Sequence, residues 1–171
     1  MLKHTATFFY TICFVLLFSF NALAQNGATS LDTDGTLPKV FLIGQHEEEF
    51  EALTASYEED LLAACEGDMD VAFGKWMSMM EEMEAYGKQI EYNLDGVKGW
   101  FHFFWDTDGR IEHIAYYLRP NSKNLDLDEM NAFLTSFMNN YKFPLVSDTK
   151  YHHYTGATFP VFFQNTGENG K

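Results

Sequence analysis

The sequence predicts an α+β fold of two layers, in the order helix, helix, strand, strand, helix, strand. Between residues 46 and 90, apolar side chains recur every three or four positions, which is the spacing of one helix face. From residue 97 to 118, β-branched and aromatic residues flank the turn motif Asp106-Thr107-Asp108-Gly109, as in a β-hairpin. Helices grouped apart from a hairpin are typical of an α+β domain, so we expect a small antiparallel sheet with helices packed on it.

Two helices are predicted before the hairpin, one over residues 46–65 and a second one after Gly67, with an apolar face that extends to Ile90. Gly67 separates them, and Asp68 or Asp70 can accept hydrogen bonds from the first free N–H groups of the second helix. The apolar face of the first helix consists of Phe50, Leu53, Tyr57, Leu61 and Ala64. The apolar face of the second helix consists of Phe73, Trp76, Met80, Met83 and Ile90.

The first hairpin strand is unusual because both of its faces are aromatic. Successive side chains of a strand point to opposite faces of the sheet. One alternating set is Phe101, Phe103 and Trp105, and the other is Trp100, His102 and Phe104. We expect the first set to pack against a third helix. The second set is either covered by the two N-terminal helices or forms an exposed patch for a partner or ligand.

A third helix is predicted after the hairpin, with Asn124 or Asp126 as its N-cap and Phe143-Pro144 beyond its end. Its apolar stripe consists of Leu127, Met130, Leu134, Phe137 and Tyr141. A last strand is predicted over residues 157–163. Pro160 has no N–H, so we expect this strand at an edge of the sheet, where unpaired backbone groups can bind a protein partner or a second copy of the chain. The residues predicted to form this partner-binding edge are Ala157, Phe159, Val161 and Phe163.

Residues 1–24 have the three parts of a secretory signal peptide: a basic start, a short apolar run and an Ala-Leu-Ala exit. The predicted cleavage lies between Ala24 and Gln25. We interpret residues 25–37 as a flexible linker, 38–164 as a single domain and 165–171 as a disordered tail. The mature protein is therefore expected in the periplasm or secreted, without a membrane anchor.

The composition limits the partners of the mature chain. All 25 acidic residues follow Ala24, whereas Lys3 is lost with the signal peptide, so the formal charge changes from −14 to −15. Such a charge repels nucleic-acid phosphates, and the sequence has no basic patch, which excludes nucleic-acid binding. Only Cys65 remains after cleavage, so no internal disulfide can form and we expect a buried thiol.

Histidines are the only candidates for a metal site. His102 and His113 lie on the two hairpin strands. A loop of two or four residues would place them on one face, whereas a three-residue loop with Gly109 left-handed would place them on opposite faces. With His152 or His153 nearby, they would suit zinc or copper. Half-buried histidines are more often without such a role, and the chain has no nucleophile or phosphate-loop motif, so we predict no metal, no cofactor and no catalytic residue.

The C-terminal half, 95–163, resembles the periplasmic C-terminal domain of TonB-type energy transducers. The matching pattern is a strand ending in Asp-x-Asp-Gly at Asp106–Gly109, a return strand, a helix, the break at Phe143-Pro144, and the final Phe159-Pro160-Val161-Phe162. The Tyr-Pro motif and the proline-rich spacer of those transducers are absent from this sequence. The whole chain resembles small exported proteins from Bacteroidota-type bacteria. The resemblance implies an envelope location and a TonB-like fold, and it implies no reaction.

The leading functional hypothesis is therefore an exported, non-catalytic envelope protein that acts as an interaction or binding module. The alternative is a metal-dependent or small-molecule enzyme that uses His102, His113 and His152 or His153.

Overall fold

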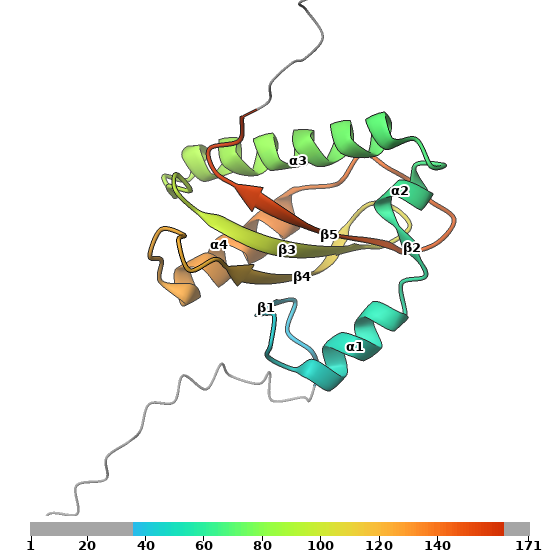
Figure 1. The fold of residues 1–171 in the computed structure, drawn as a ribbon, viewed down its shortest axis with the longest axis horizontal. Coiled ribbons are helices and arrows are strands. Elements are labelled where there is room, and N and C mark those ends of the chain that lie inside the picture. The colour runs from blue at the N-terminus through green and yellow to red at the C-terminus, as the bar shows by residue number, and fades with distance from the viewer. Residues whose placement is uncertain (1–35, 163–171) are drawn as a thin grey trace, which may run out of the picture. The chain divides into compact units, whose positions relative to one another are not determined.

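The computed structural model describes residues 36–162, and they form one five-stranded mixed sheet with helices packed on it (Figure 1). The predicted α+β class is confirmed, but two short strands enlarge the sheet and make it mixed. The strand order is β1-β4-β3-β5-β2. β3 pairs antiparallel with β4 and β5, whereas β1 and β2 pair in parallel at the two edges. The strands are β1 (Val40–Leu42), β2 (Glu59–Asp60), β3 (Lys98–Trp105), β4 (Ile111–Leu118) and β5 (Tyr151–Thr158).

The four helices of the described range lie on both faces of the sheet (Figure 1). They are α1 (Glu47–Ala55), α2 (Leu61–Ala64), α3 (Met69–Gln89) and α4 (Leu127–Asn140). α3 and α4 cover the first face, where the Trp76 ring of α3 lies 5.6 Å from Phe103 of β3. α1 lies on the second face, where its Phe50 contacts His102 at 5.7 Å and Phe104 at 6.2 Å between ring centroids. The signal peptide, the cleavage site, most of the linker, Phe163 and the tail lie outside the described residues.

The predicted helix 46–65 is in fact two helices with β2 between them. The chain leaves α1 at Ser56, whose hydroxyl donates to the Leu53 carbonyl at 2.6 Å. Tyr57 then turns inward and packs on Phe104 with 5.0 Å between the rings. A new helix begins after Asp60, whose carboxylate accepts a hydrogen bond from an N–H of its first turn. Burial of one aromatic side chain thus interrupts a pattern that reads as continuous in the sequence.

The caps of the two long helices follow the sequence. Asp68 accepts a hydrogen bond from the N–H of Val71 at 3.0 Å, and Asp126 accepts from the first turn of α4. Two side chains assigned to the apolar face of α3 were wrongly placed, because Phe73 is 54% exposed and Ile90 is 42% exposed. The residues of α3 that are buried are Ala72, Trp76, Met79, Met80, Met83 and Gly87.

The hairpin turn is a three-residue loop. The N–H of Asp106 donates to the Arg110 carbonyl at 2.9 Å, and the Asp106 carboxylate accepts from the N–H groups of Asp108 and Arg110. Gly109 has a φ of 84°, and a Cβ there would lie 2.2 Å from the carbonyl oxygen of Phe143. Both the left-handed backbone and the close contact require glycine at this position.

A β-bulge follows the turn and determines which side chains share a face. The register shifts between Phe104 and Trp105, which leaves Glu112 as the extra residue of β4. A three-residue loop alone would place His102 and His113 on opposite faces. The bulge reverses this, so both histidines belong to the second face.

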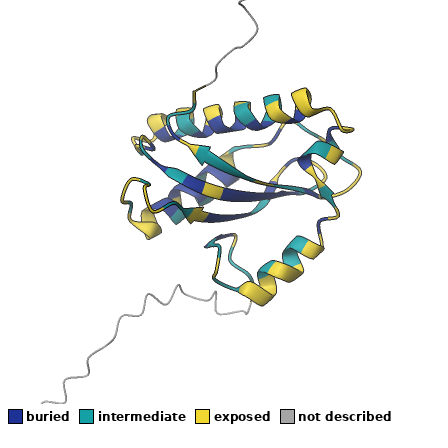
Figure 2. Ribbon diagram, in the orientation of Figure 1, coloured by how far each residue is buried: buried dark blue, intermediate teal, exposed yellow. Residues whose placement is uncertain are grey.

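The main core lies between the first face and the helices α3 and α4. Cys65 is buried there as a free thiol, as predicted, and burial raises the pKa of its thiol. The second face is covered only in part by α1, a helix that itself contains no buried residue (Figure 2). Three of its aromatic side chains are more than a third exposed, namely Trp100, Tyr117 and Tyr154.

Candidate functional site

The residues that form the open edge of the last strand differ from the predicted ones. β5 begins at Tyr151, earlier than the predicted start at residue 157, and only Ala157 of the four predicted edge residues lies in it. Phe159 is 1% exposed and belongs to the core. Val161 is no longer in the strand, because its N–H donates to the Glu84 carboxylate of α3 at 2.7 Å. Pro160 has no N–H and cannot continue the pairing with β3, so β5 lies entirely before this residue.

The outer edge of β5 has unpaired backbone groups. The N–H of Phe159 donates to the Val97 carbonyl at 2.9 Å. Phe159 and every second residue before it, Ala157 and Thr155, therefore form hydrogen bonds with β3. In an antiparallel ladder these alternate with residues whose N–H and C=O groups point away. The outward groups therefore belong to Tyr154, Gly156 and Thr158. β2 pairs with β5 only at its first two residues, so within residues 36–162 no strand pairs with this outward row.

This edge lacks three of the features that usually prevent strand pairing. Natural edges are protected by charged side chains, by proline, by a bulge or by an overlying element. Residues 154–158 read Tyr-Thr-Gly-Ala-Thr and contain neither a charge nor a proline. Their pairing with β3 shows no register shift. The open part of β5 is thus a suitable template for an additional strand.

An apolar groove of about 240 Å³ runs beside this edge, beneath α3. Its α3 side includes two methionines, whose flexible side chains adapt to different contacts. Phe162 also lines the groove and is 80% exposed. The groove is lined by Trp76, Met77, Met80, Gly156, Ala157, Thr158, Pro160, Val161 and Phe162. If another strand paired with this edge, the side chains on one of its faces would lie in this groove.

Acidic side chains lie on the elements next to this edge, together with a cation, the Arg119 guanidinium beside Gly156. β2, which pairs with the start of β5, contributes Glu59 and Asp60, and Glu58 precedes them. On α3, Glu81 is exposed one turn after Met77 of the groove. These acidic charges favour a basic partner.

The histidines form one close pair. His102 is 5% exposed, and its Nε2 lies 2.8 Å from Nδ1 of His152 on the neighbouring strand. One of these nitrogens donates and the other accepts, so the pair is bonded when both rings are neutral. Burial, and then the neighbouring His152 and His153, lower the pKa of His102 to about 3.

The other histidines do not complete a metal site with this pair. His113 shares the second face, but its Nδ1 lies 3.1 Å from the carbonyl oxygen of Pro38. His153 lies on the first face, with its ring 4.9 Å from Trp76. Across residues 36–162, no group of three or more His, Cys, Asp or Glu side chains is placed to hold a metal ion.

A polar pocket of about 430 Å³ lies beside the hairpin turn and was not predicted. At its wall the bulged Glu112 accepts hydrogen bonds from the Tyr57 hydroxyl and, at 2.7 Å, from the Lys150 ammonium. Burial acts to raise the pKa of Glu112, but the hydrogen bonds from Lys150 and Tyr57 outweigh it and the pKa is lowered. The carboxylate is thus held ionised and fully engaged in a structural network.

Comparison with known proteins gives no relative. No family model matches the sequence, and neither a curated protein nor a solved structure is significantly similar to it. Within the described residues, no helix is long and apolar enough to cross a membrane. The function must therefore be argued from the site.

The sequence predicts that the last strand lies at the edge of the sheet, but the sheet ends in β2, so β5 is open only beyond its pairing with β2 at Tyr151 and His152. The segment 151–158 reads Tyr-His-His-Tyr-Thr-Gly-Ala-Thr, and its tyrosines and threonines favour a strand. That composition could have indicated the earlier start. The groove could not be found in this way, because it depends on where α3 crosses the sheet.

Proposed function

We propose that this protein is an exported, non-catalytic binding module of the cell envelope, and that it accepts an extended, basic segment of another protein along the outer edge of β5. The observation that supports this most is the open, unprotected row at Tyr154, Gly156 and Thr158 with an apolar groove beside it. In strand addition, backbone hydrogen bonds supply affinity, and pockets for alternate side chains supply specificity. Here the open edge would supply the backbone hydrogen bonds, and the groove would supply a pocket for side chains.

The charge favours a basic partner over a second copy. Two copies pairing edge to edge would bring together two mature chains of formal charge −15 each, and their acidic residues would meet around β2 and α3. Like charges facing each other across an interface oppose association. A segment with lysine or arginine between apolar residues would meet the opposite field and fill the groove. The resemblance to TonB-type domains agrees with a role in protein–protein contact and remains part of this proposal.

Hydrogen exchange tests the docking mode with a synthetic probe. A blocked peptide of alternating valine and lysine should slow exchange at the amides of Tyr154, Gly156 and Thr158, because only these point outward. The amides of Thr155 and Ala157 already bond to β3 and should change little. A peptide of alternating valine and glutamate is the charge-reversed control and should have little effect. Protection that does not alternate along β5, or that arises elsewhere, would contradict strand addition.

A single substitution adds a control for the same experiment. Thr158→Pro removes one outward N–H and leaves the inward ladder intact, so it should weaken peptide binding about fivefold or more, the loss expected for one hydrogen bond. Thr158→Ala keeps the N–H and should bind as the unchanged protein does. Equal binding by both variants would exclude the backbone edge. A dimer that forms with increasing concentration, seen by sedimentation, would assign the edge to a second copy instead.

Export is tested separately. If residues 1–24 act as a signal peptide, intact mass measurement of the protein from its native cells should show a chain that begins within a residue or two of Gln25. Fractionation should place this chain in the envelope or the medium. A cytoplasmic pool with an uncleaved N-terminus would rule out the export part of the proposal and leave the edge proposal standing.

A further inference from the structure

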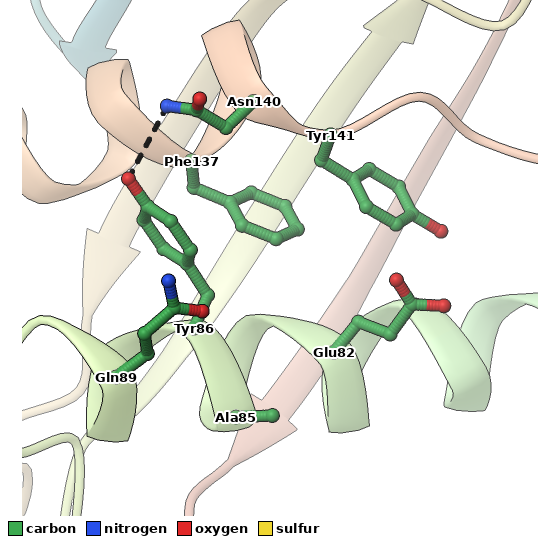
Figure 3. A pocket seen from close by; sticks show the side chains of 7 residues that line it. All are labelled: Glu82, Ala85, Tyr86, Gln89, Phe137, Asn140 and Tyr141. Atoms are coloured by element: carbon green, nitrogen blue, oxygen red, sulfur yellow. Dashed lines mark hydrogen bonds between the residues drawn. The ribbon is translucent and has the colours of Figure 1, made fainter.

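A second pocket, of about 250 Å³, lies between α3 and α4 and is separate from the β5 edge (Figure 3). Three aromatic rings form its inner wall. Phe137 stacks on Tyr141 with 4.9 Å between centroids, and Tyr86 lies on the other side of Phe137 at 5.9 Å. The polar groups at its rim come from Glu82, Gln89 and Asn140. No lysine, arginine or histidine is among its lining residues.

Hydrogen bonds hold part of this pocket in place. The Tyr86 hydroxyl lies 2.6 Å from the Ser136 hydroxyl of α4. The Asn140 amide donates to the Tyr86 hydroxyl at 3.3 Å and to the Ser136 carbonyl at 2.8 Å. Both N–H directions of this amide are thus used, which leaves its carbonyl oxygen as an acceptor. The two helices are fixed relative to each other by side chains that also line the pocket.

A negative charge lies at the rim of the pocket. The Glu82 carboxylate is exposed and forms no ion pair with the described part of the chain. The Tyr141 hydroxyl is buried in the wall, and burial, followed by the Glu82 carboxylate, raises its pKa, so it keeps its proton and adds no charge. The charge at the rim is therefore negative and favours a cationic ligand.

The backbone contributes to the same field. α4 ends at Asn140, so the pocket lies at the C-terminal end of α4, whereas Glu82 lies about two turns before the end of α3. The C-terminal end of a helix has a partial negative charge, which stabilises cations within about one turn. Aromatic faces attract organic cations, and three aromatic residues line this pocket. The Glu82 carboxylate, the end of α4 and the aromatic rings thus favour the same kind of ligand.

We infer that this pocket binds a small organic ammonium ion, with its cationic head between Glu82 and the C-terminal end of α4 and its alkyl chain against the aromatic rings. The volume admits a ligand of a few heavy atoms. A free alkylamine and the side chain of a lysine share this chemistry. The pocket takes the ammonium group in either case, and the source is distinguished by experiment.

Calorimetric titration of the full chain in physiological salt, which screens the long-range acidic field, tests the inference. The probes are n-butylammonium, n-butanol as the uncharged analogue, and Nα-acetyl-lysine amide as the lysine source. We expect n-butylammonium to bind and n-butanol not to bind. Binding of the lysine compound at comparable affinity would assign the pocket to a lysine side chain, and its failure to bind would assign the pocket to a free amine.

Matched variants locate the site. Glu82→Gln should weaken n-butylammonium binding about threefold or more, as expected for loss of an ion pair at an exposed carboxylate. Glu51→Gln changes the net charge equally at an exposed residue of α1, which lines neither this pocket nor the groove beside β5, and should leave affinity unchanged. Tyr141→Phe keeps the ring and removes only the buried hydroxyl, so it should bind n-butylammonium as the unchanged protein does. Equal effects of Glu82→Gln and Glu51→Gln, or equal binding of n-butanol, would overturn the inference.

Discussion

Trp105→Ala should lower the free energy of unfolding by about 3–5 kcal/mol, the range measured for deletion of a large buried aromatic side chain. The indole is fully buried and stacks on Phe103 at 5.6 Å and on Tyr151 at 5.3 Å between centroids. It also contacts Phe143 at 4.9 Å, in the segment after α4. The indole of β3 thus packs against both β5 and the segment after α4. Its removal leaves a cavity where these three parts of the chain meet.

Denaturant unfolding measures this loss, and two variants separate its causes. Trp100→Ala, on the same strand but on the second face and 38% exposed, should cost no more than about 1 kcal/mol. Trp105→Phe should cost clearly less than the alanine variant, since it keeps most of the packing and removes an indole N–H that has no hydrogen-bond partner among the described residues. A Trp105→Ala loss below about 1 kcal/mol would show that this face is not the core.

Acid should destabilise the protein in a range where carboxylates are still ionised. His102 has its pKa lowered to about 3 by burial, whereas a histidine in the unfolded chain titrates near 6.5. Below pH 6.5 the unfolded state therefore binds a proton that the folded state does not, and stability falls as the pH falls. Between pH 7 and pH 5, His102 alone should account for about 2 kcal/mol. Burial also lowers the pKa of His113, His152 and His153, and these groups add to the same trend.

The pH dependence of urea unfolding provides the measurement. His102→Gln should flatten the decline between pH 7 and pH 5 by about the amount given above, whatever its effect on absolute stability. Between pH 7 and pH 9 both proteins should have the same slope, because the histidines are neutral there. A decline of unchanged steepness in the variant would mean that His102 is protonated in the folded protein.

Local chemistry made much of the fold predictable. Asp68 and Asp126 are helix caps because a carboxylate at that position accepts hydrogen bonds from free N–H groups, and this depends on a few neighbouring residues only. The hairpin turn follows in the same way from Asp106 and Gly109. These elements were correct because their stabilising contacts lie within a short stretch of sequence.

The features that were missed depend on contacts between distant residues. β1 and β2 each pair in parallel with a strand far along the chain, and they are too short for a sequence pattern. The bulge at Glu112 places His113 on the same face of the sheet as His102, yet neither alternative for the loop included a bulge. The partner-binding edge was predicted at residues 157–163 because of Pro160. The open residues lie earlier, at Tyr154, Gly156 and Thr158, because Phe159 is buried in the core. The pocket between α3 and α4 depends on helix crossing and left no local pattern.

The docking of α1 determines how much aromatic surface the second face of the sheet presents. Phe50 of α1 covers His102 and Phe104, whereas the aromatic side chains around Trp100 and Tyr154 meet solvent. Ring contacts run from Trp100 through Tyr154 and His102 to Phe104. Because α1 contains no buried residue, we expect it to separate from the sheet at a smaller free energy than that of global unfolding. Such an opening would join the covered and the exposed rings into one continuous surface.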